Sequence, residues 1–154
     1  MKIIFKDKYI VPDLKSTTGF HAIGELVNHL ASVGAIAPEI AEPISLAITH
    51  REKSMSTGIG FGIAIPHAYT SLSNEIILAF GRSHGGIDFD SLDGQPVRLV
   101  VLAVFPAHEK ERHLKTLAGI SRLLHDKETR AALESARDVE VISSILNERH
   151  LAPV

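Results

Sequence analysis

The chain has 154 residues, of which 45% are hydrophobic and 22% are charged, and its formal net charge is −2. Such a length and composition predict one globular domain that spans residues 1–154 and surrounds a single core. No clustered basic excess of the kind that nucleic-acid binders carry is visible, so we expect no nucleic-acid partner. Cysteine is absent, which excludes disulfide bonds, thiol nucleophiles and zinc sites with sulfur ligands.

The first residues, MKIIFKDKYIVPDLKS, alternate charged and apolar side chains and contain no long apolar core. A signal peptide or membrane anchor needs such a core, and no stretch of the chain approaches the roughly 18 uninterrupted apolar residues of a membrane helix. We therefore expect no membrane insertion and a cytoplasmic location. Residues 3–11 predict a short strand or extended arm, which Pro12 and Asp13 end.

Two helices are expected next. Thr17 or Thr18 can cap the first, and Gly34 can end it. Pro43 would break a second helix that began as early as Pro38, so its regular part is predicted to begin near Pro43. The first helix has apolar residues at helical spacing, which predicts a core-facing stripe. The residues of that stripe are Phe20, Ile23, Val27, Leu30 and Val33.

The middle of the chain contains the predicted strands. Residues 54–62 are rich in Ser, Thr and Gly and predict a loop, after which IAI predicts a short buried strand that ends at Pro66 and His67. The apolar runs EIILAFG and PVRLVVLAVF predict two more strands, the second long enough to be central and covered on both faces. Between them, GGIDFDSLDGQP carries turn signals, and part of it can pair as a hairpin.

The last third of the chain is predicted to be helical. One helix is expected from about Lys110 to Leu124, and Asp126 and Asp138 can cap two more. Helices at both ends with apolar strands between them predict an α/β fold, in which helices cover both faces of a central β-sheet in a single-domain sandwich. The inward residues expected on the first of these helices are Leu114, Leu117, Ala118 and Leu124.

Gly58, Gly60 and Gly62 invite comparison with nucleotide-binding loops. A dinucleotide fingerprint needs a strand before the glycines and a helix after them, whereas here the order is inverted and the spacing is GxGxG. A P-loop also needs a Gly-Lys-Ser/Thr ending, which is missing. The glycines are better explained as residues that permit a tight turn with positive φ.

His67 follows this segment and is the candidate for chemistry. Most lone histidines only fill a surface or core position, and spacing alone leaves that alternative open. Pro66 fixes the preceding backbone, Ala64 and Ala68 leave room beside the ring, and ligands of α/β sheets usually bind at strand ends. A neutral imidazole is a competent nucleophile for a phosphoryl group, so phosphoryl transfer is the chemistry to expect.

The residues Arg51 and Glu52 followed by STGIGFGIAIPH resemble the signature of the type-2 enzyme IIA proteins of the bacterial phosphoenolpyruvate-dependent phosphotransferase system. This family comprises fructose, mannitol and nitrogen-regulatory members. The resemblance continues in GIDFDSLDGQPVRLVVLAVFP and HLKTLAGISRLLHD, so it covers nearly the whole chain. It implies a mixed sheet flanked by helices, which agrees with the elements expected above.

The resemblance also implies a histidine phosphocarrier. His67 would accept phosphate from the histidine-containing phosphocarrier protein and, in sugar-transporting members, pass it to the cysteine of an enzyme IIB. His113 lies where the family has a second active-site histidine, and Arg51 where it has an arginine near the phosphate. Because this chain has no cysteine, the enzyme IIB would be a separate chain. In the alternative, a nitrogen-regulatory role, the phosphorylation state of His67 would control binding to regulatory partners.

The chemistry of Arg51 and His113 suits those positions. The transition state of phosphoryl transfer spreads charge over the equatorial oxygens, to which arginine offers several fixed N–H donors and histidine one. Considered without the family, Arg51 is better explained as a solvated or paired helix charge, and His113 as a helix N-terminal residue without a task. The scheme requires no metal ion and no cofactor.

The histidines and a group of aspartates do not predict a metal site. His108 and His113 are five residues apart, which misses the i,i+4 spacing of a helical zinc site, so no metal site is expected among the nine histidines. Asp88, Asp90 and Asp93 are explained by turn formation. Many family members have Gly where this chain has Ala68, and a positive φ at that position would now be strained.

Overall fold

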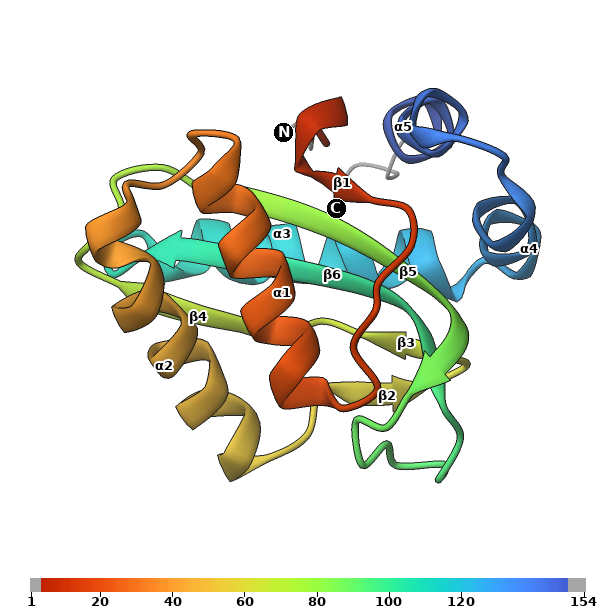
Figure 1. Cartoon of the computed structure of the whole chain (residues 1–154), viewed down its shortest axis with the longest axis horizontal. Coiled ribbons are helices and arrows are strands. Elements are labelled where there is room, and N and C mark those ends of the chain that lie inside the picture. The colour runs from red at the N-terminus through yellow and green to blue at the C-terminus, as the bar shows by residue number, and fades with distance from the viewer. Residues whose placement is uncertain (1–3, 150–154) are drawn as a thin grey trace.

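The computed structural model describes residues 4–149, and Figure 1 shows its architecture. A short 3-10 turn, η1 (Asp7–Tyr9), precedes the first strand. The strands are β1 (Ile10–Val11), β2 (Gly58–Gly60), β3 (Ile63–Ala64), β4 (His67–Thr70), β5 (Ile77–Ile87) and β6 (Val97–Pro106). The helices are α1 (Gly19–Ser32), α2 (Pro38–Ser54), α3 (Lys110–His125), α4 (Lys127–Ser135) and α5 (Val139–Glu148).

The strands form one mixed sheet in the order β1-β5-β6-β3-β2, with β4 also paired to β6. β5 and β6 are antiparallel, whereas β1 is parallel to β5, and β3 and β4 are both parallel to β6. Ile63 of β3 faces Leu99 and His67 of β4 faces Ala103 in one unbroken register. β3 and β4 are therefore two halves of a single strand that is interrupted at Ile65 and Pro66.

Helices cover both faces of the sheet, which confirms the predicted α/β sandwich. In Figure 1, α1 and α2 lie in front of the sheet, α3 lies behind it, and α4 and α5 stand at its right-hand side. Because successive residues of a strand point to opposite faces, β6 contributes to both layers of core. Val100, Leu102 and Val104 pack with α1 and α2, whereas the other layer receives Leu99, Val101, Ala103 and Phe105.

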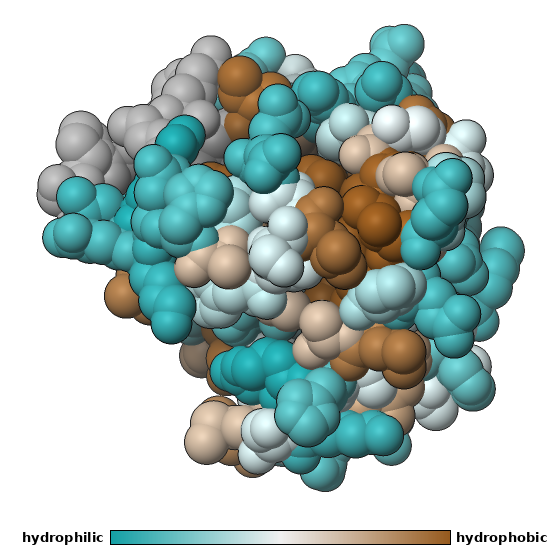
Figure 2. Space-filling model, turned by 90° about the vertical axis from the view of Figure 1, so that its left-hand side faces the viewer, coloured by the Kyte–Doolittle hydropathy of each residue, from teal (hydrophilic) through white to brown (hydrophobic). Residues whose placement is uncertain are grey.

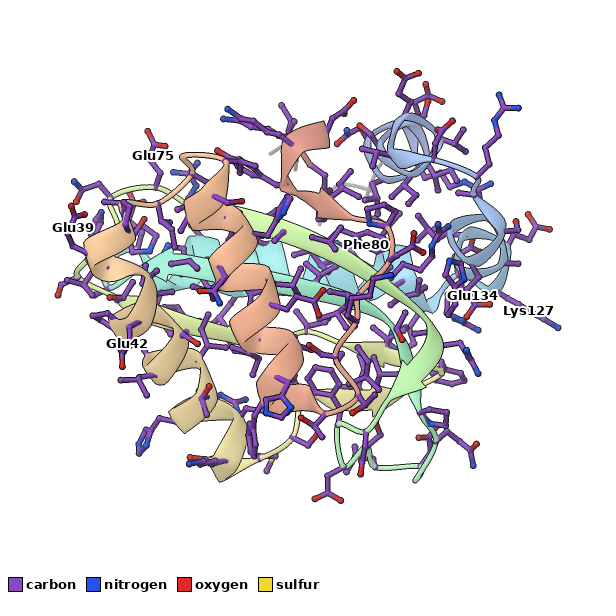
Figure 3. The ribbon with its side chains drawn as sticks, in the orientation of Figure 1. Glu39, Glu42, Glu75, Phe80, Lys127 and Glu134 are labelled. Carbon is purple, nitrogen blue, oxygen red and sulfur yellow. The ribbon has the colours of Figure 1, made fainter. Side chains whose placement is uncertain are left out.

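Side chains on β5 and α4 illustrate the core layer on the α3 side of the sheet. Phe80 of β5, labelled in Figure 3, is fully buried in the layer that α3, α4 and α5 cover. Lys127 and Glu134, labelled on α4 in the same figure, are exposed. α4 therefore buries one side, represented by Leu133, and presents charged residues on the other.

The predicted helix caps are confirmed. The hydroxyl of Thr18 accepts a hydrogen bond from the backbone N–H of His21, and Gly34 follows the end of α1 with φ +79°. The carboxylates of Asp126 and Asp138 cap α4 and α5 in the same way. These helix boundaries follow from side chains that satisfy backbone N–H groups close to them in the sequence.

One expectation for the N-terminal third was met in part and another was wrong. The short strand expected within residues 3–11 is present as Ile10–Val11, directly before Pro12, but Asp7–Tyr9 form η1 and are not extended. The second helix begins at Pro38 rather than near Pro43, which lies inside it. Pro43 removes one helical hydrogen bond, but it is exposed, so water can reach the carbonyl group left over, and the helix continues.

Three other details differ from the sequence prediction. The glycine segment is not a simple loop, because Gly58–Gly60 forms β2 and pairs antiparallel with β3. β5 is longer than expected and continues to Ile87. Phe20 and Leu114, expected to face the core, are 48% and 61% exposed, since the packed face of each helix is rotated away from them.

A polar contact joins the first described residues to the last helix. The amide side chain of Asn147 in α5 accepts a hydrogen bond from the backbone N–H of Phe5 at 2.8 Å and donates one to its carbonyl oxygen at 2.9 Å. The Phe5 side chain itself is buried in the core layer that α5 covers.

Candidate functional site

The turn between β2 and β3 fixes how the chain reaches His67. Gly60, Phe61 and Gly62 have φ values of +100°, +59° and +75°, so three successive residues have the positive φ that side chains other than glycine rarely adopt. The Gly62 carbonyl oxygen accepts hydrogen bonds from the backbone N–H groups of Arg98 and Leu99, which seat β3 against the start of β6. The two glycines therefore form the tight turn that the sequence predicted.

The sequence predicted that His67 ends a strand, but it is the first residue of β4. It follows the interruption at Ile65 and Pro66 and is half-buried. Its Nδ1 lies 2.8 Å from the carbonyl oxygen of Ile65. A carbonyl oxygen can only accept, so Nδ1 carries the proton and donates it, and Nε2 is the nitrogen left with a lone pair.

His67 and His113 contact the same two aromatic rings. The His67 ring meets Tyr69 and Phe105 edge-on, with centroids 6.4 and 6.3 Å apart. His113 of α3 stacks on Phe105 at 4.8 Å and lies tilted against Tyr69 at 5.4 Å. The ammonium group of Lys110 lies 6.0 Å from the Tyr69 ring centroid. Residues from β4, β6 and α3 thus form one aromatic cluster that contains both predicted histidines.

His113 is fully buried, and both its ring nitrogens lack a hydrogen-bond partner. Burial lowers the pKa of His113, with a smaller opposite effect from Glu109, so the ring is neutral at physiological pH. An unpaired buried polar group costs about 1–3 kcal/mol and calls for an explanation. His113 lies near the N-terminus of α3, as the alternative interpretation expected, but its ring is buried there.

Arg51 lies in the last turn of α2, where its Nη1 donates to the carbonyl oxygen of Met55 at 2.9 Å. Its neighbour Glu52 is buried and accepts hydrogen bonds from the backbone N–H and the hydroxyl of Thr57, at 2.7 and 2.6 Å. Arg51 and Glu52 therefore both fix the chain that leaves α2, the first at Met55 and the second at Thr57.

The charges of these two residues act on His67 in opposite directions. Burial is the main cause that lowers the pKa of His67, and the positive charge of Arg51 lowers it further. The hydrogen bond to Ile65 and the negative charge of Glu52 raise the same pKa but do not cancel the burial. The ring is therefore neutral at physiological pH, which is the form that has a nucleophilic lone pair.

Several residues near His67 do not stand out in the sequence. Glu52 is visible there only as part of the motif, and nothing local distinguishes Tyr69, Phe105 or Lys110, which come together through the pairing of β4 with β6 and the packing of α3. Ala68 would be strained if its φ were positive, but it lies in β4 and does not have a positive φ. Its methyl group is accommodated in the core that α1 and α2 cover.

The surface beyond β4 is partly apolar. Leu72, in the connection to β5, is 45% exposed, and Leu46 of α2 is 61% exposed. Figure 2 looks at the side of the molecule where α2 and the C-terminal ends of β4 and β6 lie, and shows hydrophobic side chains gathered among hydrophilic ones. Protein partners favour surfaces of this kind.

Within residues 4–149, neither a metal-binding cluster nor a membrane-spanning helix is present. No group of three or more His, Asp or Glu side chains in that range is placed to hold a metal ion. Likewise, none of the helices there is both long and apolar enough to cross a bilayer.

Comparison with known proteins identifies the family. Residues 3–149 match the family model described as phosphoenolpyruvate-dependent sugar phosphotransferase system, EIIA 2. The chain belongs to this EIIA family. The match covers every helix and strand described above and confirms the resemblance found in the sequence.

Relatives of this EIIA chain include both transport and regulatory proteins. It is 38% identical over 136 residues to the fructose-specific EIIABC component of Bacillus subtilis, covering 88% of this chain but only 21% of that protein. It is 36% identical over 137 residues to a nitrogen regulatory protein of Bradyrhizobium diazoefficiens, covering 89% and 88% of the two chains. The crystal structure of nitrogen regulatory protein IIA-Ntr from Neisseria meningitidis superimposes with a TM-score of 0.84 at 26% identity, over 93% of this chain and 96% of the other.

We predict that the His67 ring titrates below the usual histidine range and that Arg51→Gln moves its midpoint upward. Removing the guanidinium charge removes one of the two causes that lower the pKa, while burial remains. The measurement is a proton NMR titration of the histidine ring signals, assigned with His67→Gln. A midpoint that stays in place or falls in Arg51→Gln would contradict this account of the site's electrostatics.

We also predict that His113 makes the protein sensitive to mild acid. Below about pH 6.5 the unfolded chain protonates His113, whereas the buried ring resists, so the unfolded state binds more protons and the free energy of unfolding falls as pH falls. His113→Leu should reduce the slope of that free energy against pH, as measured by urea unfolding at several pH values. Equal slopes for the variant and the wild type would show that His113 is free to ionise in the folded state.

Proposed function

We propose that this chain is a phosphohistidine carrier, in which Nε2 of His67 accepts a phosphoryl group from the histidine-containing phosphocarrier protein. The observation that carries the proposal is the hydrogen bond from Nδ1 to the Ile65 carbonyl oxygen. It leaves Nε2 of a neutral, half-buried ring as the nucleophilic atom. Family membership supplies the chemical context, because the family is named for the phosphotransferase system.

The transfer step exchanges one nitrogen–phosphorus bond for another. The lone pair of Nε2 forms the new bond to phosphorus while the bond to the donor's histidine breaks, and that electron pair returns to the donor ring. The proton of Nδ1 stays on the hydrogen bond to Ile65 throughout. Because little covalent assistance is needed, catalysis depends on positioning and on charge stabilisation.

Arg51 and Lys110 are the positive charges proposed to stabilise the transferring group. The guanidinium of Arg51 has five N–H donors, of which the bond to Met55 uses one, so others can reach phosphoryl oxygens. Lys110 lies over Tyr69, which contacts His67. Both charges would be strongest where the aromatic cluster limits the access of water.

His113 is proposed to donate a hydrogen bond to a phosphoryl oxygen. Two observations support this role: its ring nitrogens are buried without partners, and it packs on the same Tyr69 and Phe105 that contact His67. A phosphoryl group on His67 would offer one of these nitrogens an acceptor. The cost of leaving the ring unpaired in the resting protein would then be recovered when the protein is phosphorylated.

The next acceptor is proposed to be the cysteine of a separate enzyme IIB, which would make the chain a component of sugar uptake in the cytoplasm. The similarity to a fructose-specific protein favours this acceptor. The similarity to nitrogen regulatory proteins, at nearly the same identity and over most of their length, favours the second candidate. In that case phosphorylation of His67 would control binding to a regulatory target.

The test of the carrier function is phosphorylation from labelled phosphoenolpyruvate with enzyme I and the phosphocarrier protein. We expect the wild type to take up one acid-labile, base-stable label and His67→Ala to take up none. Arg51→Ala should accept label about 100-fold more slowly, since it loses donors to the transition state. His21→Ala, at an exposed position on the start of α1, is the matched control. Equal labelling of wild type and His67→Ala would refute the proposal.

The choice between the two acceptors is tested by a chase. Labelled protein is mixed with purified enzyme IIB from the same organism, and loss of label to a cysteine of that protein is followed over time. Transfer within seconds supports the transport role. Retention of the label, together with a partner that binds only one phosphorylation state in pull-downs, supports the regulatory role.

A further inference from the structure

A continuous path of hydrogen bonds connects the end of α2 to the imidazole of His67. Glu52 accepts two hydrogen bonds from Thr57, one from its backbone N–H and one from its hydroxyl. The carbonyl oxygen of Thr57 accepts from the N–H of Ile65 at 3.4 Å. The carbonyl oxygen of Ile65 in turn accepts from Nδ1 of His67 at 2.8 Å. A buried carboxylate and the proposed nucleophile are thus joined through two residues.

Glu52 is a buried carboxylate, and its burial costs desolvation free energy that a purely structural residue would not need to incur. Its side chain is only 6% exposed, as is that of Thr57. Burying a carboxylate is costly unless its oxygens are hydrogen-bonded, and here both oxygens are bonded to one residue. These charge-assisted bonds are short and fix Thr57 at two points, which an apolar side chain at this position could not do.

A hydrogen bond beside the interruption of the strand links His67 to Thr57. Pro66 has no N–H, so the ladder with β6 loses one donor at the break between β3 and β4. The N–H of the preceding residue, Ile65, donates to the carbonyl oxygen of Thr57. This bond sets the orientation of the Ile65 backbone, and therefore the place of the carbonyl oxygen that Nδ1 of His67 uses.

We propose that Glu52 is a positioning residue for His67: by fixing Thr57 it holds the Ile65 carbonyl group that keeps the proton on Nδ1 and leaves Nε2 unprotonated. The proposed use of an unprotonated Nε2 rests on the carrier function proposed above. The hydrogen bonds themselves are present in the unphosphorylated protein and can be tested there. The negative charge of Glu52 raises the pKa of His67 but does not outweigh the lowering by burial, so the ring stays neutral and the positioning role rests on the hydrogen bonds.

The first measurement reads the position of the proton directly. In protein with nitrogen-15 in its histidines, long-range proton–nitrogen spectra at alkaline pH distinguish the Nδ1–H from the Nε2–H form of each neutral ring. We expect wild-type His67 to be in the Nδ1–H form and Glu52→Ala to show a mixture with a substantial Nε2–H fraction. Glu52→Gln can still accept from the Thr57 N–H and donate to its hydroxyl, so it should restore the Nδ1–H form.

The second measurement is the rate of phosphoryl acceptance from the phosphocarrier protein. Glu52→Ala should be about 10- to 100-fold slower than wild type, because its nucleophilic nitrogen is partly protonated and the ring is less firmly placed. Glu52→Gln should recover the larger part of that loss. Glu42→Ala is the matched control, since Glu42 is an exposed carboxylate of the same helix, labelled in Figure 3.

A second pair of variants protects the test against misfolding of Glu52→Ala. Thr57→Val removes the hydroxyl and should shift the proton of His67 in the same direction, whereas Thr57→Ser keeps it and should not. An Nδ1–H ring and an unchanged rate in folded Glu52→Ala and Thr57→Val would overturn the inference. If the wild type accepts no phosphate while the proton still shifts in these variants, the carrier function fails and the positioning role stands.

Discussion

The parallel pairing of residues 63–70 with β6 is the constraint on which the candidate site depends. β6 is buried on both faces, so a strand beside it must match its register and its alternation of side chains. Odd-numbered residues from Ile63 to Tyr69 consequently face α3, and His67 is one of them. The same register holds on both sides of Pro66, where the ladder loses a donor without losing its alignment. At this break, the carbonyl oxygen of Ile65 accepts the hydrogen bond that orients the His67 ring.

The cluster around His67 combines groups from three levels of structure. The turn at Gly60 and Gly62 is local, the pairing of β4 with β6 is a property of the sheet, and the stacking of His113 on Phe105 requires α3 to close over that sheet. The turn at Gly60 and Gly62 sets the path of the chain toward His67, and the pairing of β4 with β6 places the His67 ring. The packing of α3 adds the buried imidazole of His113. A shift at any level would change the chemistry without removing a residue.

Much of the fold could be predicted from the sequence because its signals are local. Thr18, Asp126 and Asp138 cap helices through their own neighbours, and the apolar runs of β5 and β6 match the length of buried strands. Pro43 led to a wrong prediction of where α2 begins, because tertiary packing of the rest of the helix outweighs one lost hydrogen bond. The site was harder to predict: the motif pointed to His67, but the place of Glu52, Tyr69 and Phe105 depends on pairing between distant segments. The extent of the domain, residues 1–154, stays a prediction.

The contact between Phe5 and Asn147 has a consequence for the order in which the protein assembles. The two residues are separated by almost the whole chain, yet each satisfies the other's polar groups. During synthesis on the ribosome, the N-terminal segment therefore waits for α5 before its backbone is paired there. The strands and the aromatic cluster use residues that emerge earlier, so this pair of hydrogen bonds is among the last contacts that the nascent chain can form.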